Sequence, residues 1–127
     1  MKILLVEDNL MNQKVVTFNL KKLNCDIIAA DNGSQAIDLF NSHSFDLVFM
    51  DIMLPDMNGY EVTKIFRAIE KENGVEKPVP IIALTANIYD NDKEKCFTVG
   101  MNDYISKPFT AKQLTDLIEN YMYLDTK

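Results

Sequence analysis

The chain has only two cysteines and one histidine, and this excludes several kinds of chemical site. Cys25 and Cys96 stand far apart, and neither belongs to a Cys-x-x-Cys or Cys/His cluster of the kind that zinc sites and redox-active dithiols require. We expect both to be reduced thiols among apolar neighbours. His43 lies in a polar stretch, residues 41–44, and is expected to be a surface residue without a catalytic role.

Long hydrophobic runs and an excess of positive charge are also missing. No apolar stretch approaches the ~20 residues of a membrane-spanning helix, and the apolar start meets Glu7 and Asp8 too early for a signal peptide. The net charge of -6 disfavours sequence-independent binding to nucleic acid or to an anionic membrane surface. We therefore expect a cytoplasmic protein whose partners are proteins or cations.

The 127 residues, 47% of them hydrophobic and 25% charged, fit one domain over residues 1–127 with a single core. Short apolar runs predict five strands, at residues 3–6, 26–30, 47–51, 81–84 and 103–106. Apolar residues at helical spacing predict helices that include residues 16–23, 36–40, 62–69, 89–99 and 114–121. Asn9 is a candidate helix cap, and Thr110 and Gln113 have the spacing of a capping box.

Strands that alternate with helices predict an α/β fold, a doubly wound parallel sheet covered by helices on both faces. The expected strand order is 2-1-3-4-5. Such an order changes direction between the first and third strands and opens a crevice at their carboxyl ends. A ligand site is therefore expected at that edge.

Polar residues follow four of the predicted strands. Glu7 and Asp8 follow the first, Asp51 ends the third, Thr85 follows the fourth and Lys107 follows the fifth. All five should gather at one edge of a parallel sheet. Three neighbouring carboxylates resist joint ionisation unless a cation neutralises them, and a set of oxygen ligands favours a hard ion such as Mg²⁺.

This arrangement makes Asp51 a candidate nucleophile toward phosphorus, with Mg²⁺, Lys107 and the Thr85 hydroxyl binding the phosphoryl oxygens. Plainer interpretations exist, because Asp51 could cap a helix and Thr85 could cap a turn. The residues Asp56, Asn58 and Gly59 are expected to form a turn and to bind no ligand.

Four stretches of the sequence occur in a specific order: ILLVEDN at residues 3–9, LVFMDIMLPDMNG at 47–59, PIIALTAN at 80–87 and GMNDYISKPF at 100–109. Together they resemble the receiver domain of the response-regulator family of two-component and phosphorelay signalling, over nearly the whole chain. The resemblance implies a flavodoxin-like (βα)5 fold and a phosphoryl-accepting switch. Residues 86–87 and 95–108 look more like receivers attached to hybrid sensor histidine kinases than like those that head transcription factors, and no DNA-binding segment is seen.

By this resemblance, Asp51 takes phosphate from a phosphohistidine on a histidine kinase or a histidine phosphotransfer domain. Asp8, Asp51 and the backbone carbonyl of Met53 would bind Mg²⁺ directly, and Glu7 would act through water. Lys107 would contact the phosphate. The domain would then act on a downstream protein target and assist its own phosphorylation and dephosphorylation, without being a turnover enzyme.

The resemblance also implies a switch pair, Thr85 and Tyr104. The threonine hydroxyl would move to the phosphoryl group and the tyrosine ring would turn inward, which changes the face made by the fourth helix, fifth strand and fifth helix. A cis peptide is implied between Lys107 and Pro108. Met53 and Asn87 flank the expected path of a hydrolytic water, and Met53 cannot hydrogen-bond to it, so we hypothesise unremarkable or slow self-catalysed dephosphorylation.

Alternatives from other classes are a Mg²⁺-dependent aspartyl-phosphate phosphatase, a flavin- or nucleotide-binding module, and an interaction module that is not phosphorylated. A phosphatase of the haloacid dehalogenase type needs a second Asp where this chain has Met53. No glycine-rich phosphate loop follows the first strand, which disfavours a nucleotide site. The intact acids, Thr85 and Lys107 disfavour an inert module.

Overall fold

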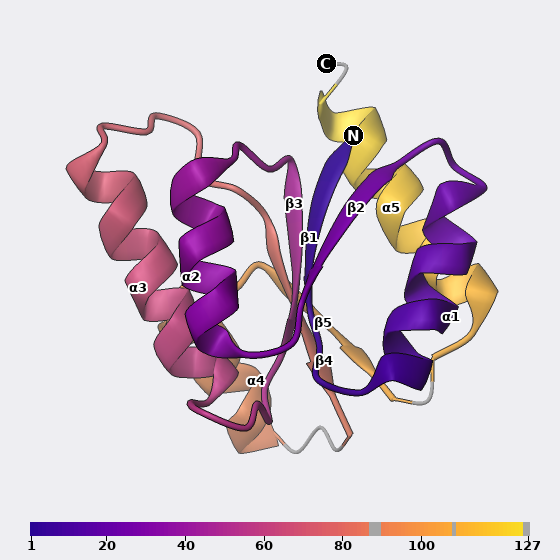
Figure 1. Ribbon diagram of the computed structural model, residues 1–127, viewed down its shortest axis with the longest axis horizontal. Coiled ribbons are helices and arrows are strands. Elements are labelled where there is room, and N and C mark those ends of the chain that lie inside the picture. Colours follow the sequence, from indigo (N-terminus) through magenta and orange to yellow (C-terminus); the bar gives the residue numbers. More distant parts are fainter. Residues whose placement is uncertain (87–89, 108, 126–127) are drawn as a thin grey trace.

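A parallel sheet with the strand order β2-β1-β3-β4-β5 forms the centre of the computed structural model (Figure 1), which describes residues 1–86, 90–107 and 109–125. The strands are β1 (Lys2–Val6), β2 (Asp26–Ala30), β3 (Leu47–Asp51), β4 (Ile81–Thr85) and β5 (Asp103–Ser106). The helices are α1 (Leu10–Lys21), α2 (Gly33–Ser42), α3 (Gly59–Glu72), α4 (Asp90–Thr98) and α5 (Ala111–Asp125). The predicted fold class and strand order are confirmed.

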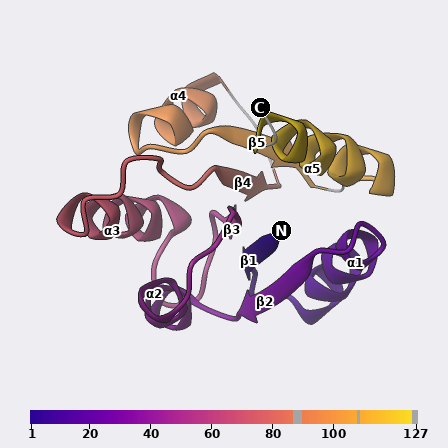
Figure 2. The same cartoon turned by 90° about the horizontal axis from the view of Figure 1, so that it is seen from above.

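Helices cover both faces of the sheet. Figure 2 shows α1 and α5 on one face and α2, α3 and α4 on the other. Each layer of helices buries its own half of the core, with Leu20 of α1 and Leu114 of α5 in one half and Val62 and Phe66 of α3 in the other. The central strand β3 is buried along its whole length, as its apolar run predicts.

Side-chain caps begin the helices where the sequence places Asn and Thr. Asn9 accepts a hydrogen bond from the backbone N–H of Asn12 at 3.0 Å, so the predicted cap of α1 is confirmed. Thr110 and Gln113 bond reciprocally, each side chain to the other residue's N–H, at 2.8 and 3.1 Å. The predicted capping box before α5 is therefore present.

The remaining sequence predictions about single residues have mixed outcomes. Cys25 and Cys96 are both buried free thiols and His43 is exposed, as predicted. The predicted helix over residues 89–99 corresponds to α4, which ends at Thr98. Residues 87, 89 and 108 lie outside the described residues, so the proposals about Asn87, the start of this helix at Tyr89 and the peptide bond of Pro108 stay predictions. Within the described parts of the chain, no helix combines the length and the apolar character needed to cross a membrane.

Arg67 joins the end of α3 to the start of β4 and to the turn before β5. Its guanidinium donates to Glu70 Oε1, the Val79 carbonyl and Asn102 Oδ1, each at 2.8 Å, and also to the Gly100 carbonyl. Glu70 is buried and its second oxygen accepts from the Val79 N–H at 2.7 Å. A single cation thus satisfies acceptors from three parts of the fold.

We predict that Arg67→Ala lowers the free energy of unfolding by about 2–4 kcal/mol, because it leaves the buried Glu70 carboxylate without its cation. Urea unfolding followed by circular dichroism measures this loss. Lys112→Ala is the matched control, since it removes an ion pair with Asp116 whose side chains are 85% and 60% exposed. Equal losses in the two variants would contradict the role given to Arg67.

Candidate functional site

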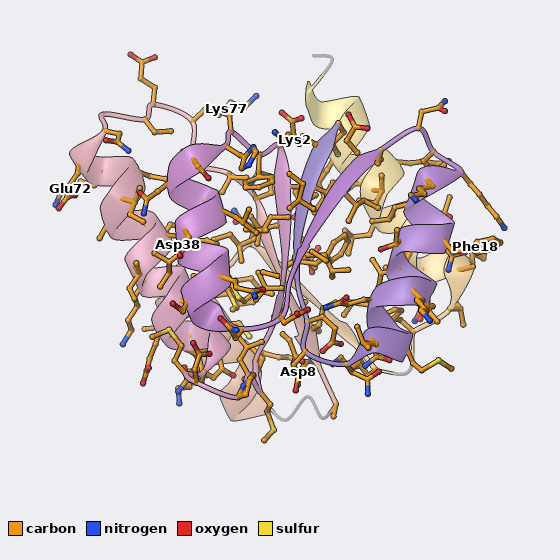
Figure 3. All side chains as sticks on the ribbon, viewed as in Figure 1. Lys2, Asp8, Phe18, Asp38, Glu72 and Lys77 are labelled. Atoms are coloured by element: carbon orange, nitrogen blue, oxygen red, sulfur yellow. The ribbon has the colours of Figure 1, made fainter. Side chains whose placement is uncertain are left out.

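The carboxyl edge of the sheet holds a cleft that contains the five polar residues predicted for the site: Glu7, Asp8, Asp51, Thr85 and Lys107. Strand register brings them together, because Val6 pairs with Met50, Asp51 with Leu84 and Thr85 with Ser106. Each of these strands therefore ends at the same height. Figure 3 shows Asp8 at this edge and Lys2 at the opposite one.

Three carboxylates form the acidic part of the cleft. Glu7, Asp8 and Asp51 each offer an oxygen, and these oxygens lie within 4.8 Å of one another. Glu7 and Asp51 are buried, whereas Asp8 is exposed. An all-oxygen set that is half buried and open to solvent on one side suits Mg²⁺, which keeps several of its waters.

Lys107 is the cation that faces the two buried acids. Its Nζ lies 2.7 Å from Glu7 Oε1 and 3.2 Å from Asp51 Oδ2. Burial alone would lower the pKa of this ammonium group, but the hydrogen bond to Glu7 and the charge of Asp51 raise it above its ordinary value. Lys107 therefore stays charged and holds the two carboxylates on either side of it.

Glu7 and Asp51 compete for ionisation. Burial raises the pKa of Asp51, and the hydrogen bond and negative charge of Glu7 raise it further, to about 7, against an opposing effect of Lys107. Burial also acts to raise the pKa of Glu7, but hydrogen bonds with Asp51 and Lys107 outweigh it and lower the value. Without a metal ion, Asp51 is therefore the acid of the pair that takes up a proton more readily.

Residues at the start of α1 orient Glu7, and the sequence interpretation did not include them. Asn12 Nδ2 donates to Glu7 Oε1 at 2.9 Å, and Gln13 Nε2 donates both to the Glu7 carbonyl and to Asp31 Oδ1. Asn12 and Tyr60 also line the cleft. The signal for Asn12 was its place in the first turn of a helix that follows an acidic pair, but spacing alone does not show which way an amide points.

Met53 contacts the candidate nucleophile through its backbone. Its N–H donates to Asp51 Oδ1 at 3.1 Å, and its side chain is 79% exposed at the rim of the cleft. Met53 also forms an isolated antiparallel bridge with Asn58. The carbonyl of Met53 as a metal ligand stays a prediction.

The predicted switch pair lies on neighbouring strands. Thr85 lines the cleft at the end of β4, and Tyr104 of β5 pairs with Ala83. The half-buried Tyr104 ring lies 6.4 Å from the ring of Phe97, edge to face, and Lys93 Nζ is 5.4 Å from its centroid. Tyr104 is not among the residues that line the cleft, but it lies on β5, which leads directly to Lys107 in the cleft.

Comparisons with known proteins agree with this geometry. The family model described as the response regulator receiver domain matches residues 3–119. The chain is 40% identical over 129 residues to hybrid signal transduction histidine kinase B of Dictyostelium discoideum. The aligned region covers 95% of this chain but only 7% of that protein. The chain thus spans a small part of the length of such a relative.

Two solved structures are similar over most of their length. One is the receiver domain of the Saccharomyces cerevisiae response regulator Ssk1, crystallised with the histidine phosphotransfer protein Ypd1; it is 35% identical, with a TM-score of 0.90 over 95% of this chain and 88% of that one. The other is the receiver domain of the Pseudomonas aeruginosa sensor histidine kinase PA1611, with a magnesium ion in its active site cleft. It is 41% identical, with a TM-score of 0.82 over 94% of this chain and 95% of that one.

The raised pKa of Asp51 predicts how stability depends on pH without metal. Between its ordinary value of 3.8 and the native value of about 7, the native state holds a proton that the unfolded chain has lost. The stability contributed by this proton is present below about pH 4 and is lost as the pH rises through about 7. Asp51→Asn keeps a donor toward Glu7 at every pH, so it should exceed wild type in free energy of unfolding by ~2 kcal/mol at pH 8.

Urea unfolding in a metal chelator, at steps from pH 4 to pH 8, measures this difference, which should narrow steadily toward pH 4. Asp8→Asn is the control, because it removes an acid from the same cluster at an exposed position. A gain in Asp51→Asn that is the same at every pH would contradict the raised pKa of Asp51.

Proposed function

The chain belongs to the response regulator receiver domain family, and we propose that its Asp51 accepts a phosphoryl group from a phosphohistidine in a Mg²⁺-dependent reaction. The observation that carries the proposal is the pairing of a buried carboxylate with a half-buried ammonium group, Asp51 Oδ2 and Lys107 Nζ, in an acidic cleft. A carboxylate oxygen of Asp51 attacks phosphorus as the bond to the histidine nitrogen breaks. The electron pair of that bond leaves with the imidazole.

Asp8, Asp51 and the Met53 carbonyl would hold Mg²⁺ directly, and Glu7 would hold it through water. The magnesium ion in the cleft of the similar receiver of PA1611 supports this assignment. When bound, Mg²⁺ supplies positive charge that ionises Asp51 near neutral pH and stabilises the phosphoryl oxygens. Lys107 supplies the second positive charge, since its Nζ already lies beside Asp51.

Thr85 and Tyr104 would report the change of charge. A phosphoryl group on Asp51 adds a dianion beside the Thr85 hydroxyl, which lines the same cleft. Movement of Thr85 toward it leaves space near β5 that the Tyr104 ring can fill. The surface altered in this way is that of α4, β5 and α5, which we propose as the contact for a downstream protein target.

Receiver domains are signalling switches, and we infer that this one modifies only itself. A turnover phosphatase would require an acid two residues after the nucleophile, and the position holds the apolar Met53. The donor would be a histidine kinase or a histidine phosphotransfer domain. The histidine kinase relatives and the similar receiver crystallised with Ypd1 support this choice.

We propose that the donor docks on the α1 apolar face, which consists of Leu10, Met11, Val15 and Phe18. Met11 and Phe18 are 71% and 63% exposed, and Phe18 points away from the sheet in Figure 3. Contiguous exposed apolar side chains mark interaction surfaces, and α1 begins at the cleft, where Asn9 and Asn12 form part of the lining. A donor seated on α1 would therefore bring its histidine to Asp51.

We predict that wild type gains the mass of one phosphoryl group when it is incubated with acetyl phosphate and Mg²⁺, and that Asp51→Ala does not. Intact-protein mass spectrometry measures the gain. Addition of a chelator should abolish it, because the carboxylates then lack their cation. An unmodified wild type, or equal modification of Asp51→Ala, would sink the proposed function.

Phe18→Ser should slow phosphoryl transfer from a phosphorylated histidine phosphotransfer protein roughly tenfold or more, as loss of a buried aromatic contact does at protein interfaces. Labelling by acetyl phosphate should be unchanged, since that donor needs no protein surface. Val75→Ser is the matched control, an exposed apolar residue between α3 and β4. Equal slowing with both donors would mean that Phe18 affects the cleft and not docking.

A further inference from the structure

We propose that Asp56 is a positioning residue for the candidate site: it holds the β3–α3 loop (residues 52–58) against α2 and thereby fixes the Met53 peptide that contacts Asp51. The role in metal binding rests on the proposed function. The sequence predicted turn chemistry at Asp56, with no ligand role required. The structure gives this side chain two specific partners in another element.

Asp56 uses both of its carboxylate oxygens on the first turn of α2. Oδ1 accepts from the Gly33 N–H at 2.8 Å and Oδ2 accepts from the Ser34 N–H at 3.0 Å. These are two of the backbone N–H groups that a helix leaves without an internal partner. The hydrogen bonds from Gly33 and Ser34 keep the pKa of Asp56 below its usual value, so the contact persists as a charge-assisted pair near neutral pH.

Gly33 permits this close approach. A Cβ at that position would lie 2.5 Å from Met57 Cγ and 2.7 Å from Met57 Sδ, which is too near for either atom to remain in place. Met57 thus packs where a side chain of residue 33 would stand, next to the hydrogen bonds of Asp56. The tip of the loop is held on α2 by both polar and apolar contacts.

The other end of the same loop touches the site. The Met53 N–H donates to Asp51 Oδ1, the Met53–Asn58 bridge closes the loop, and the Gly59 N–H donates to the Ile52 carbonyl at 2.8 Å. These bonds fix the shape of the loop, but they do not fix where it sits over α2. Asp56 and Met57 supply that constraint together, and loss of the two Asp56 hydrogen bonds would let Met53 move relative to Asp51.

Asn32 offers a matched control, because it caps the same helix end from within. Its Oδ1 accepts from the Gln35 N–H at 2.8 Å. Among the described residues, Asn32 makes no hydrogen bond to the β3–α3 loop. Asn32→Ala and Asp56→Ala should therefore weaken α2 in similar ways. Only Asp56→Ala should also release the loop.

The experiment compares wild type, Asp56→Ala, Asp56→Asn and Asn32→Ala by calorimetric titration with Mg²⁺ and by amide hydrogen exchange without metal. We expect the Mg²⁺ dissociation constant of Asp56→Ala to rise roughly tenfold, the lower range for loss of a group that orients metal ligands. Asp56→Asn, which keeps one anchoring acceptor, should lie between Asp56→Ala and wild type. Exchange of the Met53 amide should accelerate in Asp56→Ala, whereas both readouts should match wild type in Asn32→Ala.

Unchanged Met53 exchange in Asp56→Ala, or the same changes in Asn32→Ala, would overturn the positioning role. The exchange measurement needs no metal, so it tests the contact with α2 independently of the proposed function. A wild type that binds no Mg²⁺ would instead overturn the proposed metal site. Folding of each variant is checked by its urea midpoint, and Asp56→Asn keeps the comparison meaningful if the alanine variant is too unstable.

Discussion

The structure depends on the burial of two carboxylates at the ends of adjacent parallel strands. Glu7 and Asp51 are withdrawn from water, and their negative charges repel each other in the buried site. Lys107, and the raised pKa that lets Asp51 take up a proton, reduce this repulsion. The free energy that this burial costs is offset by the packing of the sheet, whose parallel register and two apolar faces fix the strand ends. A divalent cation bound between the carboxylates would reduce the same repulsion. The repulsion that destabilises the folded chain is therefore also the interaction that favours metal binding at the site.

Contacts from residues other than the five predicted site residues hold the site in position. Asn12 and Gln13 orient Glu7 from α1, and Asp56 ties the loop after β3 to α2. Two of these contacts join segments that follow different strands: Gln13 also donates to Asp31 after β2, and Asp56 after β3 accepts from Gly33 of α2. Residues that never touch a phosphoryl group can therefore determine how closely Asp51, its metal ligands and Lys107 keep their relative positions.

Much of this arrangement could be predicted from the sequence, because strands and sites obey short-range rules. The position of the site at the carboxyl edge of the sheet was predicted from the apolar run before Asp51 and from the polar residues that follow the other strands. The starts of two helices were predicted from Asn9 and Thr110. The partners of Asp56 and Arg67 could not be predicted in this way. Gly33 and Ser34 lie 22 or 23 residues from Asp56, and Gly100 and Asn102 lie 33 and 35 residues from Arg67, so only the packing of whole helices brings them within hydrogen-bond distance.

The sheet separates the two halves of the core, and this separation extends to the surfaces outside them. The α1 apolar face lies over one half, whereas α4 covers the half that also contacts Tyr104 (Figure 2). The target surface proposed above also includes α5, which lies on the same face of the sheet as α1 (Figure 2). A target that bound only α4 would approach from the side opposite to α1 and could be held together with a donor, whereas a target that also covered α5 would compete with that donor.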